Sequence, residues 1–133
     1  IADRRQTVEL RRWSRNLKKI EYLGGVAFKY TYAYTENPEF AAFQAIALSP
    51  FVDVVTTTGP GTGEPPQPNK IRAMKEAIGK KPLAIASGID ASNLVDYLGF
   101  VDKLLVSSSL ETFKYSGRFV EDRVRELVDV ANK

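Results

Sequence analysis

The chain of 133 residues contains no cysteine and no histidine. Without cysteine it forms neither disulfides nor thiolate sites, and without histidine it lacks the commonest general base and metal ligand. No apolar run approaches the roughly 20 residues of a membrane-spanning helix, and no signal-peptide core is visible. We therefore expect a cytoplasmic protein with no membrane span and no metal site. The sequence leaves any cofactor undetermined.

What is present is the composition of one globular domain, with 44% hydrophobic and 26% charged residues. We interpret residues 1–133 as a single unit. Because the chain begins with Ile1 and its only methionine is Met74, we expect that it is not an intact translation product.

The formal net charge is +3, and basic residues crowd the first predicted helix. A basic helix can meet nucleic acid, or it can present a solvated outer face. We favour the solvated face, because apolar residues recur at helical spacing and predict a packing face on the other side of this helix. Those residues are Leu10, Trp13, Leu17 and Ile20. A nucleic-acid partner is therefore the disfavoured alternative.

Hydrophobic periodicity along the chain predicts strands that alternate with helices. The expected strands lie near 26–34, 52–58, 83–87 and 102–107, and the expected helices near 3–21, 38–48, 69–78, 91–98 and 120–132. Such alternation predicts an α/β fold with parallel strands and outer helices. A TIM (β/α)8 barrel takes about 250 residues, so four βα units correspond to half of one.

Two successive predicted strands break into small polar residues at their carboxyl ends. Ser87 and Gly88 follow the strand near 83–87, and Ser107, Ser108 and Ser109 follow the strand near 102–107. Exposed backbone N–H groups there favour an anion. In a (β/α)8 barrel a phosphate site follows strands seven and eight, so this chain corresponds to the carboxyl-terminal half. We predict a phosphate site on these five residues, although the serines also fit a plain helix cap.

The most loop-like segment follows the predicted strand near 52–58. Its candidate ligand-loop residues are Thr58, Gly59, Thr62 and Gly63. The loop is not a P-loop, because no Gly-Lys-Ser/Thr follows. Glycines at this density indicate backbone close to a ligand or a lid hinge, and a plain connector is the alternative.

Lys29 lies within residues 26–34, where bulky and small residues alternate. If this is a barrel strand, the aromatic row packs under helices and Lys29 projects inward, where an unpaired ammonium needs an anionic partner. The alternative is a lysine on the solvated side of an ordinary strand. If the protein is an enzyme, Lys29 is the best candidate for a Schiff base or an electrostatic catalyst.

Other residues are assigned to structure. Asp53 and Asp102 precede their predicted strands, at the edge opposite the expected site. In the helix near 38–48, Asn37 is the expected N-cap, and Phe40, Phe43, Ala47 and Leu48 form the expected packing stripe.

These motifs, taken together, resemble the BtpA/SgcQ family, which is named for a photosystem I biogenesis factor and classed with ribulose-phosphate-binding barrels. The matching segments are residues 11–12, 26–29, 58–59, 62–66, 87–89, 93–94, 106–110 and 120–124. The resemblance implies a barrel that binds a phosphorylated small molecule, and we expect any reaction to be that of a sugar-phosphate lyase, isomerase or transferase. Two departures stand out: Tyr30 replaces the family's usual histidine, and Ser107 replaces a glycine.

Two further expectations concern the protein's role and its assembly. The lack of histidine and cysteine also fits a non-enzymatic assembly or biogenesis factor that uses the barrel as a scaffold. A half-barrel leaves two open sheet edges, so we expect self-association or a missing amino-terminal half, with a flat flavodoxin-like sheet as the third possibility.

Overall fold

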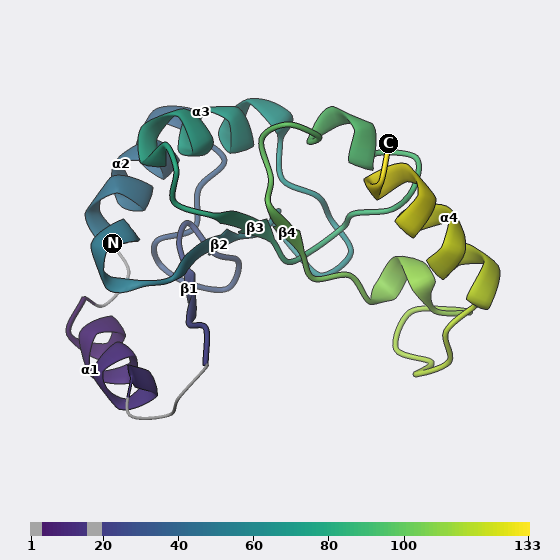
Figure 1. Ribbon diagram of the computed structural model, residues 1–133, viewed down its shortest axis with the longest axis horizontal. Helices are drawn as coiled ribbons and strands as arrows, with labels where there is room; N and C mark the ends of the chain where they lie inside the picture. Colours follow the sequence, from purple (N-terminus) through teal and green to yellow (C-terminus); the bar gives the residue numbers. More distant parts are fainter. Residues whose placement is uncertain (1–3, 16–19) are drawn as a thin grey trace.

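The computed structural model describes residues 4–15 and 20–133. These residues form four α-helices, four short strands and three single-turn 3-10 helices (Figure 1). Helices and strands alternate up to β3, and only a 3-10 helix separates β3 from β4. In chain order the elements are α1 (Arg4–Arg15), β1 (Leu23–Gly25), α2 (Pro38–Leu48), η1 (Ser49–Phe51), β2 (Val54–Thr57), α3 (Pro68–Ile78), β3 (Leu83–Ile85), η2 (Leu94–Asp96), β4 (Lys103–Leu104), η3 (Ser108–Leu110) and α4 (Glu121–Ala131).

The four strands form one parallel sheet in which their spatial order equals their order in the chain. The expected α/β fold with a parallel sheet is therefore confirmed. Every residue of β2 and β3 is buried, as in parallel sheets covered on both faces. The strands after β1 are shorter than the hydrophobic pattern suggested, but each lies within its expected range.

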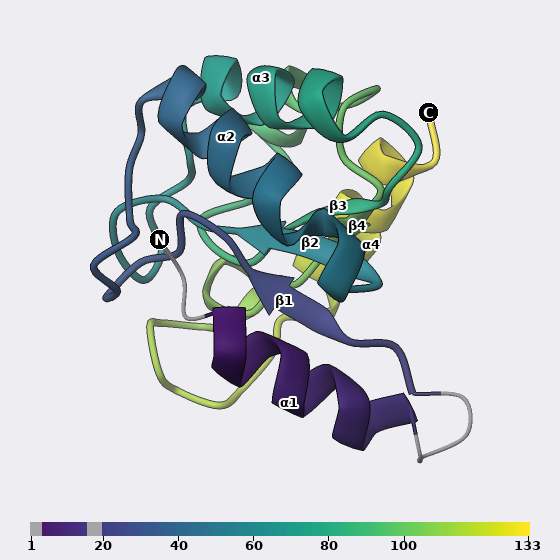
Figure 2. The ribbon, with the colours of Figure 1, turned by 90° about the vertical axis from the view of Figure 1, so that its left-hand side faces the viewer.

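Helices α2 and α3 lie side by side on one face of the sheet, whereas α1 lies on the other side of β1 (Figure 2). The core under α2 and α3 consists of small and branched side chains. From the helices these include Ala41, Ala45, Leu48, Ile71 and Met74, and from the sheet Val55, Leu83 and Ile85. The carboxyl ends of all four strands meet at one edge of the sheet, because the strands are parallel.

The expected strand near 26–34 is wrong. The strand β1 ends at Gly25, and a loop follows up to α2. Ala27 and Tyr30 have positive φ angles of 48° and 63°, a left-handed conformation that no strand continues through. The Ala27 N–H donates to Gln44 Oε1 on α2 at 3.1 Å, so a side chain takes the place of a ladder bond. Two of the three tyrosines expected under helices are exposed, Tyr30 by 77% and Tyr32 completely, and Tyr34 is half-buried.

The expected helix near 91–98 is also wrong, because only the short η2 and turns occur there. Asp90 Oδ1 accepts hydrogen bonds from the N–H groups of Ser92 and Asn93, both at 2.9 Å. Asn93 Nδ2 donates in turn to Gly88 O at 2.8 Å. Such local side-chain bonds to the backbone compete with helix formation.

The packing stripe expected on the first helix is not packed. Leu10 is 44% and Trp13 is 64% exposed, and α1 ends at Arg15. Ile20 lies beyond it and is also exposed. Residue 3 and residues 16–19 of the expected helix, Leu17 included, lie outside the described residues.

The stripe expected on α2 is only partly correct. Leu48 is buried as expected, but Phe40 and Phe43 are exposed, and Ala41 and Ala45 are buried in their place. The sequence of α2 is apolar around most of its circumference, so the spacing alone did not identify the buried face. Among the described residues, no helix combines the length and the apolarity needed to cross a bilayer.

Candidate functional site

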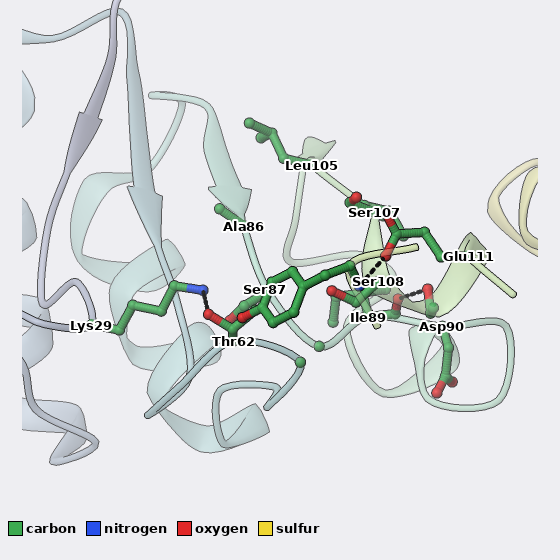
Figure 3. Close-up of a pocket in the computed structure, with 15 residues that line it drawn as sticks. Lys29, Thr62, Ala86, Ser87, Ile89, Asp90, Leu105, Ser107, Ser108 and Glu111 are labelled. Atoms are coloured by element: carbon green, nitrogen blue, oxygen red, sulfur yellow. Dashed lines mark hydrogen bonds between the residues drawn. The ribbon is translucent and has the colours of Figure 1, made fainter. Parts of the chain in front are cut away.

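A cavity of about 440 Å³ lies at the carboxyl edge of the sheet (Figure 3). Loops after all four strands contribute to its lining. Lys29 comes from the loop after β1, and Thr62 and Gly63 come from the loop after β2. The other predicted residues that line it follow β3 and β4: Ser87, Gly88, Ser107, Ser108 and Ser109.

Two predicted ligand-loop residues, Thr58 and Gly59, do not line this cavity but are buried beside it. Thr58 Oγ1 accepts a hydrogen bond from the Lys29 N–H at 2.7 Å. The Gly59 N–H donates to Ser87 Oγ at 3.0 Å. In this structure both residues hold the loops together instead of facing the cavity.

Two of the predicted hydroxyls are already engaged within the protein. Ser87 Oγ accepts from Gly59 and donates to Glu64 O at 2.9 Å, which ties the loop after β2 to the end of β3. Ser109 Oγ donates to Ile89 O at 2.7 Å. Each serine has one hydroxyl proton, so neither hydroxyl has a proton left for a ligand.

Gly88 is required by the protein itself. Its φ is +72°, and a Cβ there would lie 2.1 Å from Pro65 N. The loop after β2 therefore packs directly against the backbone that follows β3. The absence of a side chain at Gly88 is thus required by the packing of the protein's own backbone.

The backbone donors at the two strand ends are free. Within the described part of the chain, the N–H groups of Gly88, Ser107, Ser108 and Ser109 donate no hydrogen bond. The hydroxyls of Ser107 and Ser108 likewise have no partner among the described residues. These residues line one cavity from two neighbouring strand ends, and unpaired backbone N–H groups at such a place favour an anion.

Three charged side chains border the cavity: Lys29, Asp90 and Glu111. The half-buried Lys29 reaches Thr62 Oγ1 with its Nζ, at a long 3.4 Å. Burial acts to raise the pKa of Asp90, but hydrogen bonds from the turn that follows outweigh burial and lower this pKa. Glu111 is only 7% exposed, and sequence reasoning missed it. No sequence pattern distinguishes it from the exposed acids around it.

Thr62 joins three loops at the mouth of the cavity. Its N–H donates to the Tyr30 phenol oxygen at 3.0 Å, and the two hydroxyls are 3.1 Å apart. Lys114, from the loop after β4, donates from Nζ to Thr62 O at 3.0 Å. The hydrogen bonds from Thr62 lower the pKa of Tyr30. The loops after β1 and β4 are thus both fastened to the loop after β2.

A fully buried lysine lies beneath the site and was not expected from the sequence. Lys70 Nζ donates to Ala27 O at 3.1 Å and to Thr58 O at 2.8 Å, and lies 3.1 Å from a carboxylate oxygen of Glu36. Burial lowers the pKa of Lys70, and Glu36 opposes this shift. The sequence offers one signal for Lys70. The residue lies in the first turn of its helix, where the helix dipole disfavours a cation.

Comparison with models of known protein families and with curated protein sequences gave no match to this chain. The described residues contain no group of three or more acidic side chains placed to hold a metal ion. The assignment of a function therefore depends on the geometry of the cavity.

Proposed function

We propose that this protein binds a small phosphorylated molecule at the carboxyl edge of its sheet. The observation that supports this most strongly is the set of unpaired N–H groups at Gly88, Ser107, Ser108 and Ser109, which border the same cavity as Lys29. Phosphate oxygens accept hydrogen bonds from such amides, and a lysine ammonium adds charge. The volume of the cavity is in the usual range for small-ligand sites, about 300–1,000 Å³.

The order of the strands supports the further proposal that the sheet is half of a (β/α)8 barrel. The strands follow one another in chain order, whereas a doubly wound sheet reverses its strand order at a switch point. The proposal agrees with the resemblance to the BtpA/SgcQ family. Among the described residues, β1 and β4 are edges without a further strand, and we propose that a second copy of the chain completes them. Light scattering during size-exclusion chromatography tests this, and a monomer at all concentrations contradicts it.

A binding protein without catalysis is the second candidate. The hydroxyls of Ser87 and Ser109 are held by carbonyl oxygens, so neither is poised as a nucleophile. Lys29 is then an electrostatic contact to the ligand, and catalysis through it requires a ligand carbonyl within reach.

Isothermal titration calorimetry with inorganic phosphate and ethyl phosphate tests the proposed function. The wild-type protein should bind both, and Lys29→Met should weaken binding by about 10- to 100-fold, as expected for the loss of one charge-assisted contact. The matched control is Lys80→Met, because Lys80 is exposed and remote from the cavity. Absence of heat and of thermal stabilisation with millimolar phosphate would rule out the proposed function.

A further inference from the structure

Glu111 is a buried acidic residue that lines the cavity. The residue is 7% exposed and follows η3 directly. Its Oε2 accepts a hydrogen bond from the Tyr115 N–H at 3.0 Å, which fixes the side chain. Its Oε1 has no hydrogen-bond partner among the described residues. It is also not one of their fully buried polar atoms, so it remains accessible. One oxygen is therefore anchored, and the other is available to the cavity.

Two of the three charged groups that border the cavity, Lys29 and Glu111, lie on opposite sides of it. Figure 3 shows Lys29 at one side and Glu111 at the other, with Thr62 and Ser87 between them. The third charged residue, Asp90, has its Oδ1 occupied by three hydrogen bonds from Ser92 and Asn93. The cavity is thus bipolar, with a cation at one side and an anion at the other.

A ligand that is only anionic does not match this arrangement. A carboxylate accepts hydrogen bonds but donates none, so Glu111 repels a bare phosphate that occupies the amides of Ser108 and Ser109. Among the described residues, no cation forms an ion pair with the carboxylate of Glu111. Arg123 contacts the main-chain oxygen of Glu111 instead. A buried carboxylate is stabilised when a cation pairs with it.

We propose that Glu111 is the specificity-determining residue of this cavity and selects a zwitterionic phosphomonoester, one that carries an ammonium group close to its phosphate. The ammonium pairs with the free Oε1 of Glu111, while the phosphate takes the amides at the ends of β3 and β4 and the charge of Lys29. This inference rests on the proposed function, because it assumes that the cavity binds a phosphate.

The test compares ethyl phosphate with 2-aminoethyl phosphate, two probes that differ in the ammonium group alone. Wild-type protein should bind 2-aminoethyl phosphate at least tenfold more tightly in calorimetric titrations at fixed ionic strength. Glu111→Gln keeps an oxygen for the Tyr115 N–H but removes the charge. This variant should bind ethyl phosphate more tightly than wild type does, bind 2-aminoethyl phosphate more weakly, and lose the preference. Glu126→Gln, at an exposed position outside the cavity, is the matched control and should keep it.

The outcomes separate the two proposals. If neither probe binds to wild type, the proposed function fails. If both bind equally, or if Glu111→Gln keeps the preference, the cavity binds phosphate but Glu111 does not select the ligand. Glycerol phosphate serves as a third probe, and tighter binding of it than of 2-aminoethyl phosphate overturns the assignment of an ammonium. Thermal unfolding of each variant, followed by circular dichroism, shows whether the variant remains folded.

Discussion

Lys70 Nζ lies 2.8 Å from the main-chain oxygen of Thr58, although the lysine belongs to the first turn of α3 and the threonine follows β2. The same threonine accepts the main-chain N–H of Lys29 through its hydroxyl. One residue, Thr58, therefore contacts both the buried Lys70 and the half-buried Lys29. The loop after β1 owes its conformation to these contacts from α2, α3 and the end of β2, and not to strand pairing.

Replacement of Lys70 by methionine should lower the free energy of unfolding by about 3 kcal/mol. It leaves the Thr58 oxygen without a donor and Glu36 without its cation, and the Ala27 oxygen keeps only the Thr57 hydroxyl, at 3.3 Å. Urea unfolding measures this change. Lys80→Met, at an exposed position just after α3, should change stability by no more than about 0.5 kcal/mol. Equal effects of the two substitutions would show that Lys70 does not fasten the loops.

Gly88→Ala should destabilise the protein by more than about 3 kcal/mol. The new Cβ would collide with the backbone of Glu64 and Pro65, and the positive φ adds strain. Gly117 also has a positive φ of 70°, but a Cβ there meets nothing within 4 Å. Gly117→Ala should therefore lower the free energy of unfolding through backbone strain alone, by about 1 kcal/mol. Thermal and urea unfolding of the pair separate the steric effect from strain, and similar losses would contradict the close packing at Gly88.

Asp102 should contribute to stability in mild acid and at neutral pH. Its Oδ2 accepts from the Leu83 N–H and from Lys75 Nζ, both at 2.8 Å. Burial acts to raise the pKa of Asp102, but these hydrogen bonds outweigh burial and the pKa is lowered. The folded pKa thus lies below the unfolded value of about 3.9. The contribution is fully present above pH ~4 and is lost as pH falls through the lowered folded pKa.

Asp102→Ala should accordingly lose about 0.5 to 1 kcal/mol at pH 7, because solvent screens this exposed carboxylate, and the difference from wild type should shrink below pH ~4. Urea midpoints between pH 2 and 7 measure it. Asp129→Ala, at an exposed position near the end of α4, serves as the control. A difference that stays constant down to pH 2 would show that the carboxylate of Asp102 is not responsible.

Tyr97 should make the protein sensitive to alkali. The phenol is buried and donates to Pro66 O, and burial, followed by the charges of Asp96 and Glu36, raises its pKa to about 12. A raised folded pKa means that the contribution of Tyr97 is present below the unfolded value near 10 and is lost as pH rises towards 12. Tyr97→Phe should lose about 1 kcal/mol at pH 8.

Between pH ~10 and 12 the stability of Tyr97→Phe should fall less than that of wild type. Melting temperatures across this range measure the difference. Tyr32→Phe is the control because this side chain is fully exposed, and its profile should follow wild type. If Tyr97→Phe also follows wild type throughout, Tyr97 does not ionise with unfolding.

Parts of the fold that depend on neighbouring residues agree with the sequence. The helix expected over 38–48 is α2, where Asn37 Oδ1 accepts from the Phe40 N–H at 3.0 Å as an N-cap should. Asp53 and Asp102 bind backbone N–H groups of Tyr22 and Leu83 at the amino edge of the sheet, the structural role expected of them. The N-cap is local to a few residues, and the two aspartates follow from their place at the amino ends of parallel strands.

By itself, the sequence determined that helices alternate with parallel strands, and it located three helices and the small polar residues at the ends of β3 and β4. These features follow from local periodicity, caps and chain order. Only the tertiary structure decided that residues 26–34 form a loop, that Phe40 and Phe43 face outward, and that Lys70 and Glu111 are buried at the site. Those outcomes depend on which distant groups supply hydrogen bonds and charges, and side chains far apart in the chain compete for the same backbone in a way that periodicity does not record.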